Sequence, residues 1–197
     1  MSINMPSLKR TDRSRGLILD AADGAFREKG FAAVSMEEIA SRAGLTRKTL
    51  YNLFGSKEEI AHQLIARVEA QDEGYRARMA AGEDALGLLE TILLDSAGWC
   101  LANPTVARLA LAPAERPRLE PPEGRPSFQG LVRDVLRLGQ QQGAIRRDED
   151  VNFMSLVLLG VYGQAMLTAL AGGPFEPCDI VRLIRIVVEG VGARRAE

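Results

Sequence analysis

The amino-acid sequence predicts an all-α fold, in which a small N-terminal domain of three helices precedes a larger helical domain. No stretch of the 197 residues alternates between apolar and polar side chains for long enough to indicate a β-strand. Alanine, leucine, arginine and glutamate, which favour helices, dominate the chain instead. In addition, three helix starts and a tight glycine turn lie within Ser35–Glu59, a spacing typical of a helix-turn-helix.

The first helix is expected to follow a basic arm that ends at Arg15, with residues 1–8 disordered before the arm. It should run to about Lys29, whose positive charge suits a helix C-terminus, and Gly30 should end it. Its apolar residues recur at the spacing of an amphipathic helix. They are Ile18, Ala22, Ala25 and Phe26.

Two Ser-x-x-Glu sequences predict the starts of the second and fourth helices. In a capping box, the serine hydroxyl accepts from the third helical N–H, and the glutamate reaches back to the N–H of the serine. Ser35 with Glu38 and Ser56 with Glu59 have this spacing. The sequence therefore predicts helices that begin directly after Ser35 and Ser56.

A helix ends and the next begins between these two boxes. Gly44 is placed to take the left-handed conformation that ends a helix, and Thr46 is placed to cap the third helix. Two short helices joined in this way form the motif whose second helix enters the major groove of DNA. The inward residues that would unite them in one small core are Ile39, Ala40, Ala43, Leu50 and Phe54.

The rest of the chain is expected to form about six further helices. A helix that begins at Lys57 should continue as far as Met79 and so connect two domains. Five prolines within residues 113–126 predict a loop there. The other helices are expected at about 83–102, 104–112, 127–142, 148–171 and 178–192.

Charge and cysteine content narrow the function class. Residues 1–57 carry ten Lys/Arg against six Asp/Glu, whereas the remainder carries 15 against 20, a pattern that suits a nucleic-acid-binding module joined to a second domain. Cys100 and Cys178 lie 78 positions apart and the chain has one histidine, so neither a zinc site nor a disulfide framework is indicated. With no secretory signal, we expect a cytoplasmic protein with reduced cysteines.

The stretch from Val151 to Phe175 has no charged residue, and a membrane span needs ~20 apolar residues. Polar residues such as Asn152, Ser155 and Gln164 interrupt it, so a helix buried in a bundle or a subunit interface is favoured over a membrane span. The chain also lacks a metal cluster, a nucleophile elbow and a phosphate loop. We therefore expect neither an enzyme nor a bound cofactor.

The segment from Arg15 to Ile60 resembles the TetR family of transcriptional regulators. The matching residues are Ile18-Leu19-Asp20-Ala21-Ala22, Phe26, Gly30-Phe31, Val34-Ser35-Met36, Ile39-Ala40, Ala43-Gly44-Leu45-Thr46, Thr49-Leu50-Tyr51, Phe54 and Ser56-Lys57-Glu58. The resemblance implies three N-terminal helices that bind DNA, and about six more that form a ligand pocket and a dimer interface. It places the DNA-binding domain at residues 11–71, with the fourth helix shared, and the effector-binding and dimerisation domain at 72–197.

The outward face of the third helix is expected to contact DNA. Arg47 and Lys48 have the reach for guanine or phosphate, and the sequence leaves open which. The resemblance implies that Tyr51, and Lys57 at the start of the fourth helix, meet phosphates. The predicted DNA-binding residues are Thr46, Arg47, Lys48, Thr49, Tyr51, Asn52 and Lys57. Two departures from the family pattern lie in this segment: Leu53 stands where many members have histidine, and Arg47-Lys48 is more basic than the common pair.

A two-fold dimer would read a palindromic operator. The best candidates for its interface are the uncharged helix at 151–171 and the stripe formed by Ile180, Leu183, Ile184, Val187, Val188 and Val191. The ligand pocket is implied by the resemblance, and its mostly apolar candidates favour a hydrophobic small molecule. These candidates, each equally suited to a core role, are Trp99, Cys100, Phe128, Leu131, Tyr162 and Met166.

The sequence as a whole indicates a homodimeric repressor that a small hydrophobic ligand releases from DNA, without a membrane partner. Two alternatives stay open at this stage. One is an activator built in the same way. The other is a helical protein-interaction module that does not bind DNA.

Overall fold

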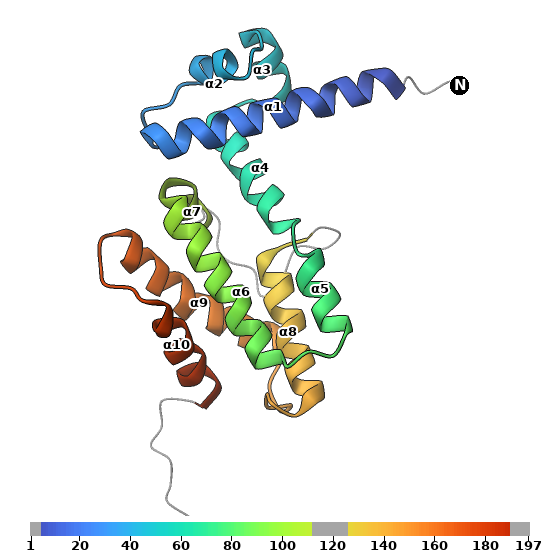
Figure 1. The fold of residues 1–197 in the computed structure, drawn as a ribbon, viewed down its shortest axis with the longest axis vertical. Helices are drawn as coiled ribbons and strands as arrows, with labels where there is room; N and C mark the ends of the chain where they lie inside the picture. Colours follow the sequence, from blue (N-terminus) through green and yellow to red (C-terminus); the bar gives the residue numbers. More distant parts are fainter. Residues whose placement is uncertain (1–4, 112–125, 190–197) are drawn as a thin grey trace, which may run out of the picture. The chain divides into compact units, whose positions relative to one another are not determined.

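The computed structural model describes residues 5–111 and 126–189, and these residues form ten α-helices and no β-strand (Figure 1). The prediction of an all-α fold is therefore confirmed. The chain divides into two compact units. Unit 1 comprises the residues up to Val68 together with Ala102–Ala110, and unit 2 comprises Glu69–Leu101 and the residues from Leu111 onward.

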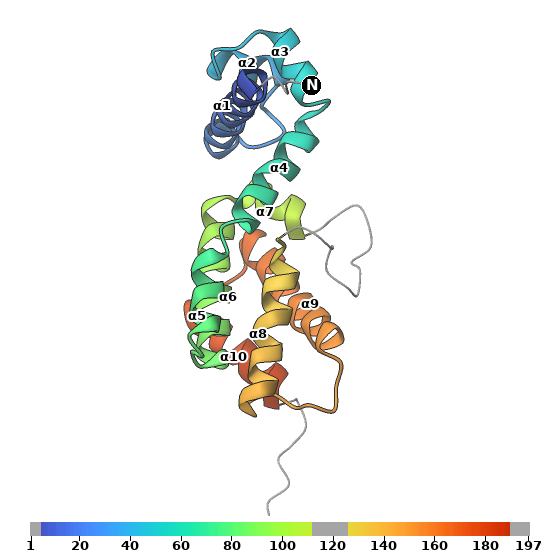
Figure 2. The ribbon, with the colours of Figure 1, turned by 90° about the vertical axis from the view of Figure 1, so that its right-hand side faces the viewer.

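Unit 1 contains three N-terminal helices and most of two others. They are α1 (Met5–Lys29), α2 (Met36–Arg42), α3 (Arg47–Leu53), α4 (Lys57–Glu69) and α7 (Pro104–Leu111). The short helix α2 packs against both α1 and α3 (Figures 1 and 2). Their shared core includes Ile18, Ala22, Ala25, Phe26, Ile39, Ala40, Leu50, Phe54, Ile60 and Leu64. The predicted core is confirmed except for Ala43, which is only half-buried.

The hydroxyl half of each predicted capping box is present. Ser35 Oγ accepts from the Glu38 N–H at 3.1 Å, and Ser56 Oγ accepts from the Glu59 N–H at 3.2 Å. The carboxylate half differs from the prediction, because Glu38 pairs with two basic side chains and Glu59 accepts instead from the Gly55 N–H at 2.7 Å. Both helices thus begin where the sequence predicts, with a different partner for each glutamate.

Helix α1 begins at Met5, well before the end of the basic arm expected to precede it. The helical conformation continues through Arg15, whose guanidinium lies 5.1 Å from the centre of the Phe54 ring. Through this cation–π contact, Arg15, the last residue of the expected arm, packs against unit 1. The other end of α1 is as predicted, since Gly30 has a φ of +79° and its N–H donates to Phe26 O at 2.9 Å.

Helix α4 ends at Glu69, and a separate helix α5 (Glu73–Ala80) follows. The prediction of one helix from Lys57 to Met79 is therefore wrong. Asp72 lies at the start of α5 and is buried, and its carboxylate pairs with Arg76 at 2.6 Å. Asp72, a residue type common at helix starts, directly precedes α5, and Gly74 lies in its first turn, so the sequence held local signals of the break that the prediction passed over.

Unit 2 contains α5 and four longer helices, namely α6 (Ala85–Ala102), α8 (Phe128–Gln142), α9 (Val151–Leu170) and α10 (Pro177–Glu189). Helix α9 packs against α8 and α10 (Figure 2). Polar side chains join other pairs, since Tyr75 on α5 donates to Asp95 on α6 at 2.6 Å and Gln142 on α8 accepts from the Ala85 N–H at 2.9 Å. The expected helices agree to within a few residues, and nearly all of the predicted loop at 113–126 lies outside the described residues.

Two helices of the described chain, α6 and α9, are long and apolar enough to cross a membrane by length and composition alone. Core helices of soluble proteins pass the same test. Helix α9 buries Leu158, Tyr162 and Met166 but exposes other apolar residues on its opposite side. Within a single chain, α9 is therefore buried on one side only. The expected burial of its other side in a subunit interface stays a prediction.

Candidate DNA-binding site

Helix α3 divides its residues cleanly between the core and the surface of unit 1. Leu50 is fully buried and Phe54, which follows the helix, is 1% exposed. On the opposite side, Tyr51 is 49% exposed and the Arg47 side chain is 72% exposed. Because the apolar residues hold the helix and the polar ones point outward, α3 has the build of a recognition helix.

The turn before α3 has the predicted geometry. Gly44 has a φ of +66°, in the left-handed region that favours glycine. Thr46 then caps the helix, because its Oγ1 accepts from the Thr49 N–H at 3.1 Å. The two threonine hydroxyls also bond each other at 2.9 Å. The start of α3 is thus fixed by its own side chains before any partner binds.

The cations of α3 have weak protein partners or none. Arg47 Nη1 lies 3.9 Å from Glu37 Oε1, the outer limit for an ion pair, and Lys48 has no ion pair or hydrogen bond among the described residues. Behind α3, by contrast, Arg42 pairs with Glu28 at 2.8 Å and with Glu38 at 3.0 Å. The charge of Arg42 is therefore neutralised within the protein, whereas the charges of Arg47 and Lys48 are left available for DNA.

The ion pairs behind α3 form one network that joins α1 to α2. Lys29 Nζ lies 2.7 Å from Glu38 Oε1, the same oxygen that Arg42 approaches. The hydrogen bond from Lys29 holds the pKa of Glu38 below its ordinary value of 4.5, and Arg42 acts in the same direction. The hydrogen bond from Arg42 likewise lowers the pKa of Glu28.

Lys57 does not point outward with the other predicted residues. Its Nζ donates to Phe31 O at 2.6 Å and to Val34 O at 2.8 Å, and it lies 4.4 Å from the centre of the Phe31 ring. The structure thus exposes Thr46, Arg47, Lys48, Tyr51 and Asn52, leaves Thr49 half-buried, and places the ammonium of Lys57 on the connection between α1 and α2.

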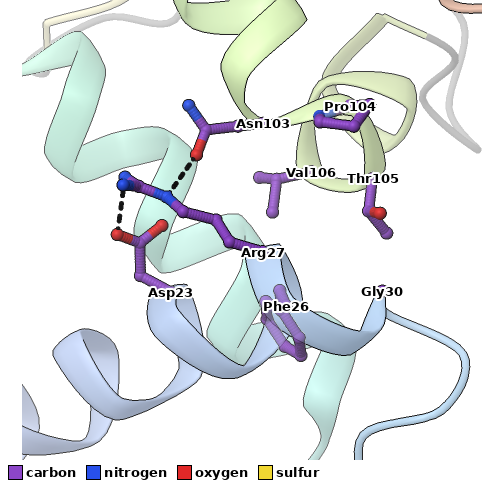
Figure 3. Close-up of a pocket in the computed structure, with 8 residues that line it drawn as sticks. All are labelled: Asp23, Phe26, Arg27, Gly30, Asn103, Pro104, Thr105 and Val106. Carbon is purple, nitrogen blue, oxygen red and sulfur yellow. Dashed lines mark hydrogen bonds and ion pairs between the residues drawn. The ribbon is translucent and has the colours of Figure 1, made fainter.

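A small cavity of about 70 Å³ lies between α1 and α7 within unit 1 (Figure 3). Arg27 crosses it, donating from Nε to Asn103 Oδ1 at 2.7 Å while its Nη2 lies 2.8 Å from Asp23 Oδ2. Pockets for small-molecule ligands usually have volumes of ~300–1,000 Å³. This cavity is too small for such a ligand, and its polar groups already satisfy one another.

In unit 2, four of the six predicted ligand-binding residues are buried: Cys100, Leu131, Tyr162 and Met166. Phe128 and Trp99 are half-buried, and the Phe128 ring lies 6.2 Å from that of Tyr162. The Tyr162 hydroxyl donates to Ser96 Oγ at 2.9 Å. Burial raises the pKa of Tyr162 above its ordinary value and that of Cys100 to about 11, so both stay neutral at physiological pH.

Ser96 was not among the residues predicted from the sequence. It lies one helical turn before Cys100, within the apolar helix α6, and this position was the available signal. Together, Ser96, Cys100 and Tyr162 form a polar cluster inside unit 2. Among the described residues, no group of three or more His, Cys, Asp or Glu side chains is arranged to hold a metal ion.

A helix-turn-helix with an exposed, cationic second helix defines a class of DNA-binding proteins. Comparison with known proteins narrows this class to one family of DNA-binding domains. Residues 18–64 match the family described as bacterial regulatory proteins, tetR family. An uncharacterized HTH-type transcriptional regulator of Mycobacterium tuberculosis is 39% identical over 61 residues, which span 31% of this chain and 30% of the relative. The HTH-type transcriptional repressor KstR2 of Rhodococcus jostii is 28% identical over 185 residues, covering 89% of this chain and 90% of the repressor.

Solved structures show the same fold along nearly the whole chain. Thermus thermophilus FadR, a TetR-family repressor in complex with lauroyl-CoA, matches with a TM-score of 0.74 and 23% identity, over 92% of this chain and 97% of FadR. FadR from Bacillus subtilis, in complex with stearoyl-CoA, matches with a TM-score of 0.68 and 17% identity, over 89% and 98%. The family match over residues 18–64 and the similarity to KstR2 along most of the chain both support a transcriptional regulator of the TetR type.

Proposed function

We propose that the protein is a homodimeric transcriptional repressor that binds a palindromic operator and leaves it when a small hydrophobic ligand binds. The observation that carries this proposal is the recognition helix, which buries Leu50 and keeps Arg47 and Lys48 exposed with weak partners or none. The repressor KstR2 from Rhodococcus jostii, similar along nearly the whole chain, supports the sign of regulation. We propose that the protein acts in the cytoplasm, without catalysis and without a membrane partner.

The proposed DNA contacts divide into two groups. Arg47 reads a base, and Asn52 reads adenine or bonds the backbone, while the remaining residues fix the register on phosphates. Thr46 and Thr49 already bond each other, so a phosphate contact would use their remaining hydrogen-bonding capacity. The residues proposed to contact phosphate are Thr46, Lys48, Thr49, Tyr51 and Lys57.

The DNA-binding proposal is tested by selecting bound duplexes from a random pool and measuring the affinity of two variants for the selected operator. Arg47→Ala should cost ~1–3 kcal/mol and relax the preference at one base position. Lys48→Ala should weaken binding to every sequence and reduce the dependence on salt. A uniform loss for Arg47→Ala would contradict its role in base recognition, and a wild-type protein that binds no duplex at low salt would favour a protein-interaction module.

The proposed dimer rests on an apolar surface of unit 2. Phe153, Val157 and Val161 on α9 recur every fourth residue and are 51%, 43% and 45% exposed. Val181 and Ile186 on α10 are similarly exposed, at 44% and 47%. Exposed large apolar residues that recur on one side of a helix are typical of protein–protein contacts. Of the predicted stripe on α10, Ile180, Leu183 and Ile184 are buried in the chain itself, and Val191 lies outside the described residues.

Val157→Asp should turn the dimer into a monomer, because the new carboxylate would be buried without a partner at the interface. Sedimentation velocity at micromolar concentration measures the change. Val68→Asp is the matched control, since Val68 is 37% exposed, belongs to unit 1 and is not among the residues of the proposed interface, and the variant should stay dimeric. A wild-type protein that is monomeric at that concentration would contradict the proposed dimer.

The ligand site is proposed for the interior of unit 2, around Tyr162, Cys100 and Phe128. Its surroundings are apolar, and the Tyr162–Ser96 pair supplies polar groups that fix a ligand's orientation. Because two proteins of this fold hold acyl-CoA molecules, lauroyl-CoA is a suitable first probe. Trp99 is the single tryptophan of the chain, so its fluorescence should change as a ligand enters.

A ligand releases the protein from DNA only if it binds more tightly to the conformation that has the lower affinity for DNA. By linkage, bound operator must weaken ligand binding by the same factor.

Activation of transcription is the second candidate function, since a segment of 56 residues is 41% identical to the HTH-type transcriptional activator FasR of Mycolicibacterium smegmatis. Transcription assays with and without the protein, on a template that carries the selected operator, distinguish repression from activation.

A further inference from the structure

A single residue, Asn103, separates helix α6, which lies in unit 2 up to Leu101, from helix α7 of unit 1. Asn103 is 5% exposed, and its Oδ1 accepts from Nε of Arg27 on α1 at 2.7 Å (Figure 3). Asp23, one turn earlier on α1, lies 2.8 Å from Nη2 of the same guanidinium. The residue that directly follows α6 is thus bonded through its side chain to the first helix of unit 1.

The polar cluster of unit 2 lies on the same side of α6 as Asn103. Ser96, Cys100 and Asn103 recur at the spacing i, i+4, i+7, which places them along one side of a helix. Ser96 Oγ accepts from the Tyr162 hydroxyl at 2.9 Å, at the proposed ligand site. Cys100 precedes Asn103 by less than one turn, about 4.5 Å along the helix axis. A displacement of α6 at the cluster would therefore reach the bond to Arg27 within one turn.

On the side of unit 1, the bond is placed to act on the support of the recognition helix. Arg27 follows Phe26, which is 2% exposed in the core of unit 1. Helix α1 packs against α2, and α2 packs against α3. The cavity of about 70 Å³ beside the bond leaves room for Arg27 and the start of α7 to move, which a closely packed interior would resist (Figure 3).

We propose that Arg27 and Asn103 are positioning residues for the release of DNA, and that their bond transmits a ligand-induced displacement of α6 to α1. This role rests on the proposed function, because it assigns the coupling between the ligand site and the DNA-binding site to one contact. Neither residue touches the ligand or DNA in this role. Loss of the bond should therefore change how strongly the two sites affect each other.

The release factor, which is the ratio of the operator affinities without and with lauroyl-CoA, measures this coupling. Arg27→Met and Asn103→Leu each remove the bond, and each should lower the release factor by about 2–30-fold. The double variant should lower it no further than either single variant, because both remove the same contact. Asn103→Asp keeps an acceptor for the guanidinium and should retain the wild-type release factor. A loss of stability alone would change both affinities together and leave their ratio unchanged.

Lys29→Met is the matched control for the loss of a cation from α1. The Lys29 side chain is 50% exposed, against 54% for Arg27, but it pairs with Glu38 on α2 and not with Asn103. The control should keep the wild-type release factor. Unchanged release factors in Arg27→Met and Asn103→Leu would overturn the proposal, and so would an equal fall in Lys29→Met.

A second measurement needs no ligand, because coupling between two sites is reciprocal. Trp99 lies on α6, four residues before Asn103, so its fluorescence should change when the selected operator binds. The change should be absent in Arg27→Met, and a change that persists in this variant would overturn the proposal. If lauroyl-CoA does not release the wild type, this measurement decides. Wild-type protein that binds no duplex would instead refute the proposed function.

Discussion

The two units of the molecule place their polar groups differently. In unit 1 the buried side chains are apolar except for Asn103, and the ion pairs that join α1 to α2 lie at the surface. In unit 2 polar groups lie inside, since Ser155 is fully buried and Tyr162, 1% exposed, bonds Ser96 within the helix bundle. A mostly apolar core suits a rigid element that must present side chains at fixed spacing, whereas interior polar groups give a ligand something to bond.

The largest effect is expected where the core of unit 1 is cut. Phe54→Ala should cost about 3–5 kcal/mol of unfolding free energy, because it removes a ring that is 1% exposed and leaves a cavity beneath α3. The same change also removes the contact with Arg15. Urea unfolding followed by circular dichroism measures the loss, and DNA binding should disappear with it.

Tyr51→Ala is the control on the same helix. Tyr51 is 49% exposed, so its removal should change stability by less than about 0.5 kcal/mol. Its effect on DNA binding should nevertheless be clear if its hydroxyl meets a phosphate. A loss of unfolding free energy below about 1 kcal/mol for Phe54→Ala would show that the stability of unit 1 does not depend on its apolar core.

A smaller effect is expected from the interior polar groups of unit 2. Tyr162→Phe should cost about 1 kcal/mol, because Ser96 loses the hydroxyl that donates to it while the ring stays in place. Ser96→Ala removes the same bond, so the double variant should lose less than the sum of the two. Thermal unfolding of the three variants measures this coupling, and independent effects would mean that the pair is not a unit.

The Tyr162 contribution should also fade at high pH. Burial raises the pKa of its hydroxyl above the ordinary value of 10, so the folded state holds the proton more tightly than the unfolded state. The stabilisation is therefore complete below about pH 10 and is lost as the pH rises through the folded-state pKa. In Tyr162→Phe this alkaline loss should be smaller than in the wild type.

The contrast between the units also explains how much the sequence could predict. Unit 1 is specified by local signals, and the start of α2 at Ser35, the turn at Gly44 and the cap at Thr46 all lie where those signals place them. At the break between α4 and α5, Asp72 and Gly74 are local signals, but no local pattern encodes the burial of Asp72. The position of Ser96, one turn before Cys100, is a weak local signal, and its bond to Tyr162 joins residues 66 positions apart.

Lys57 shows a limit of a different kind. Its place in the motif is local and was recognised, but the partners of its ammonium, Phe31 O and Val34 O, lie 26 and 23 residues earlier in the chain. A motif identifies which residue occurs at a position and leaves open which of several polar groups that residue bonds. The same holds for Glu38, whose carboxylate joins two basic side chains in place of the capping contact.

The smallest effect is expected from the surface network of unit 1, and it should depend on pH. The hydrogen bond from Lys29 lowers the pKa of Glu38 below 4.5 in the folded state, so the stabilisation is present above that value and is lost as the pH falls through the folded-state pKa. Glu38→Gln should lower the melting temperature slightly at about pH 7, and the difference from the wild type should vanish in acid. Exposed ion pairs contribute little to stability. A fall in melting temperature as large as that of Tyr162→Phe would therefore mean that this surface network stabilises unit 1 more than exposed ion pairs usually do.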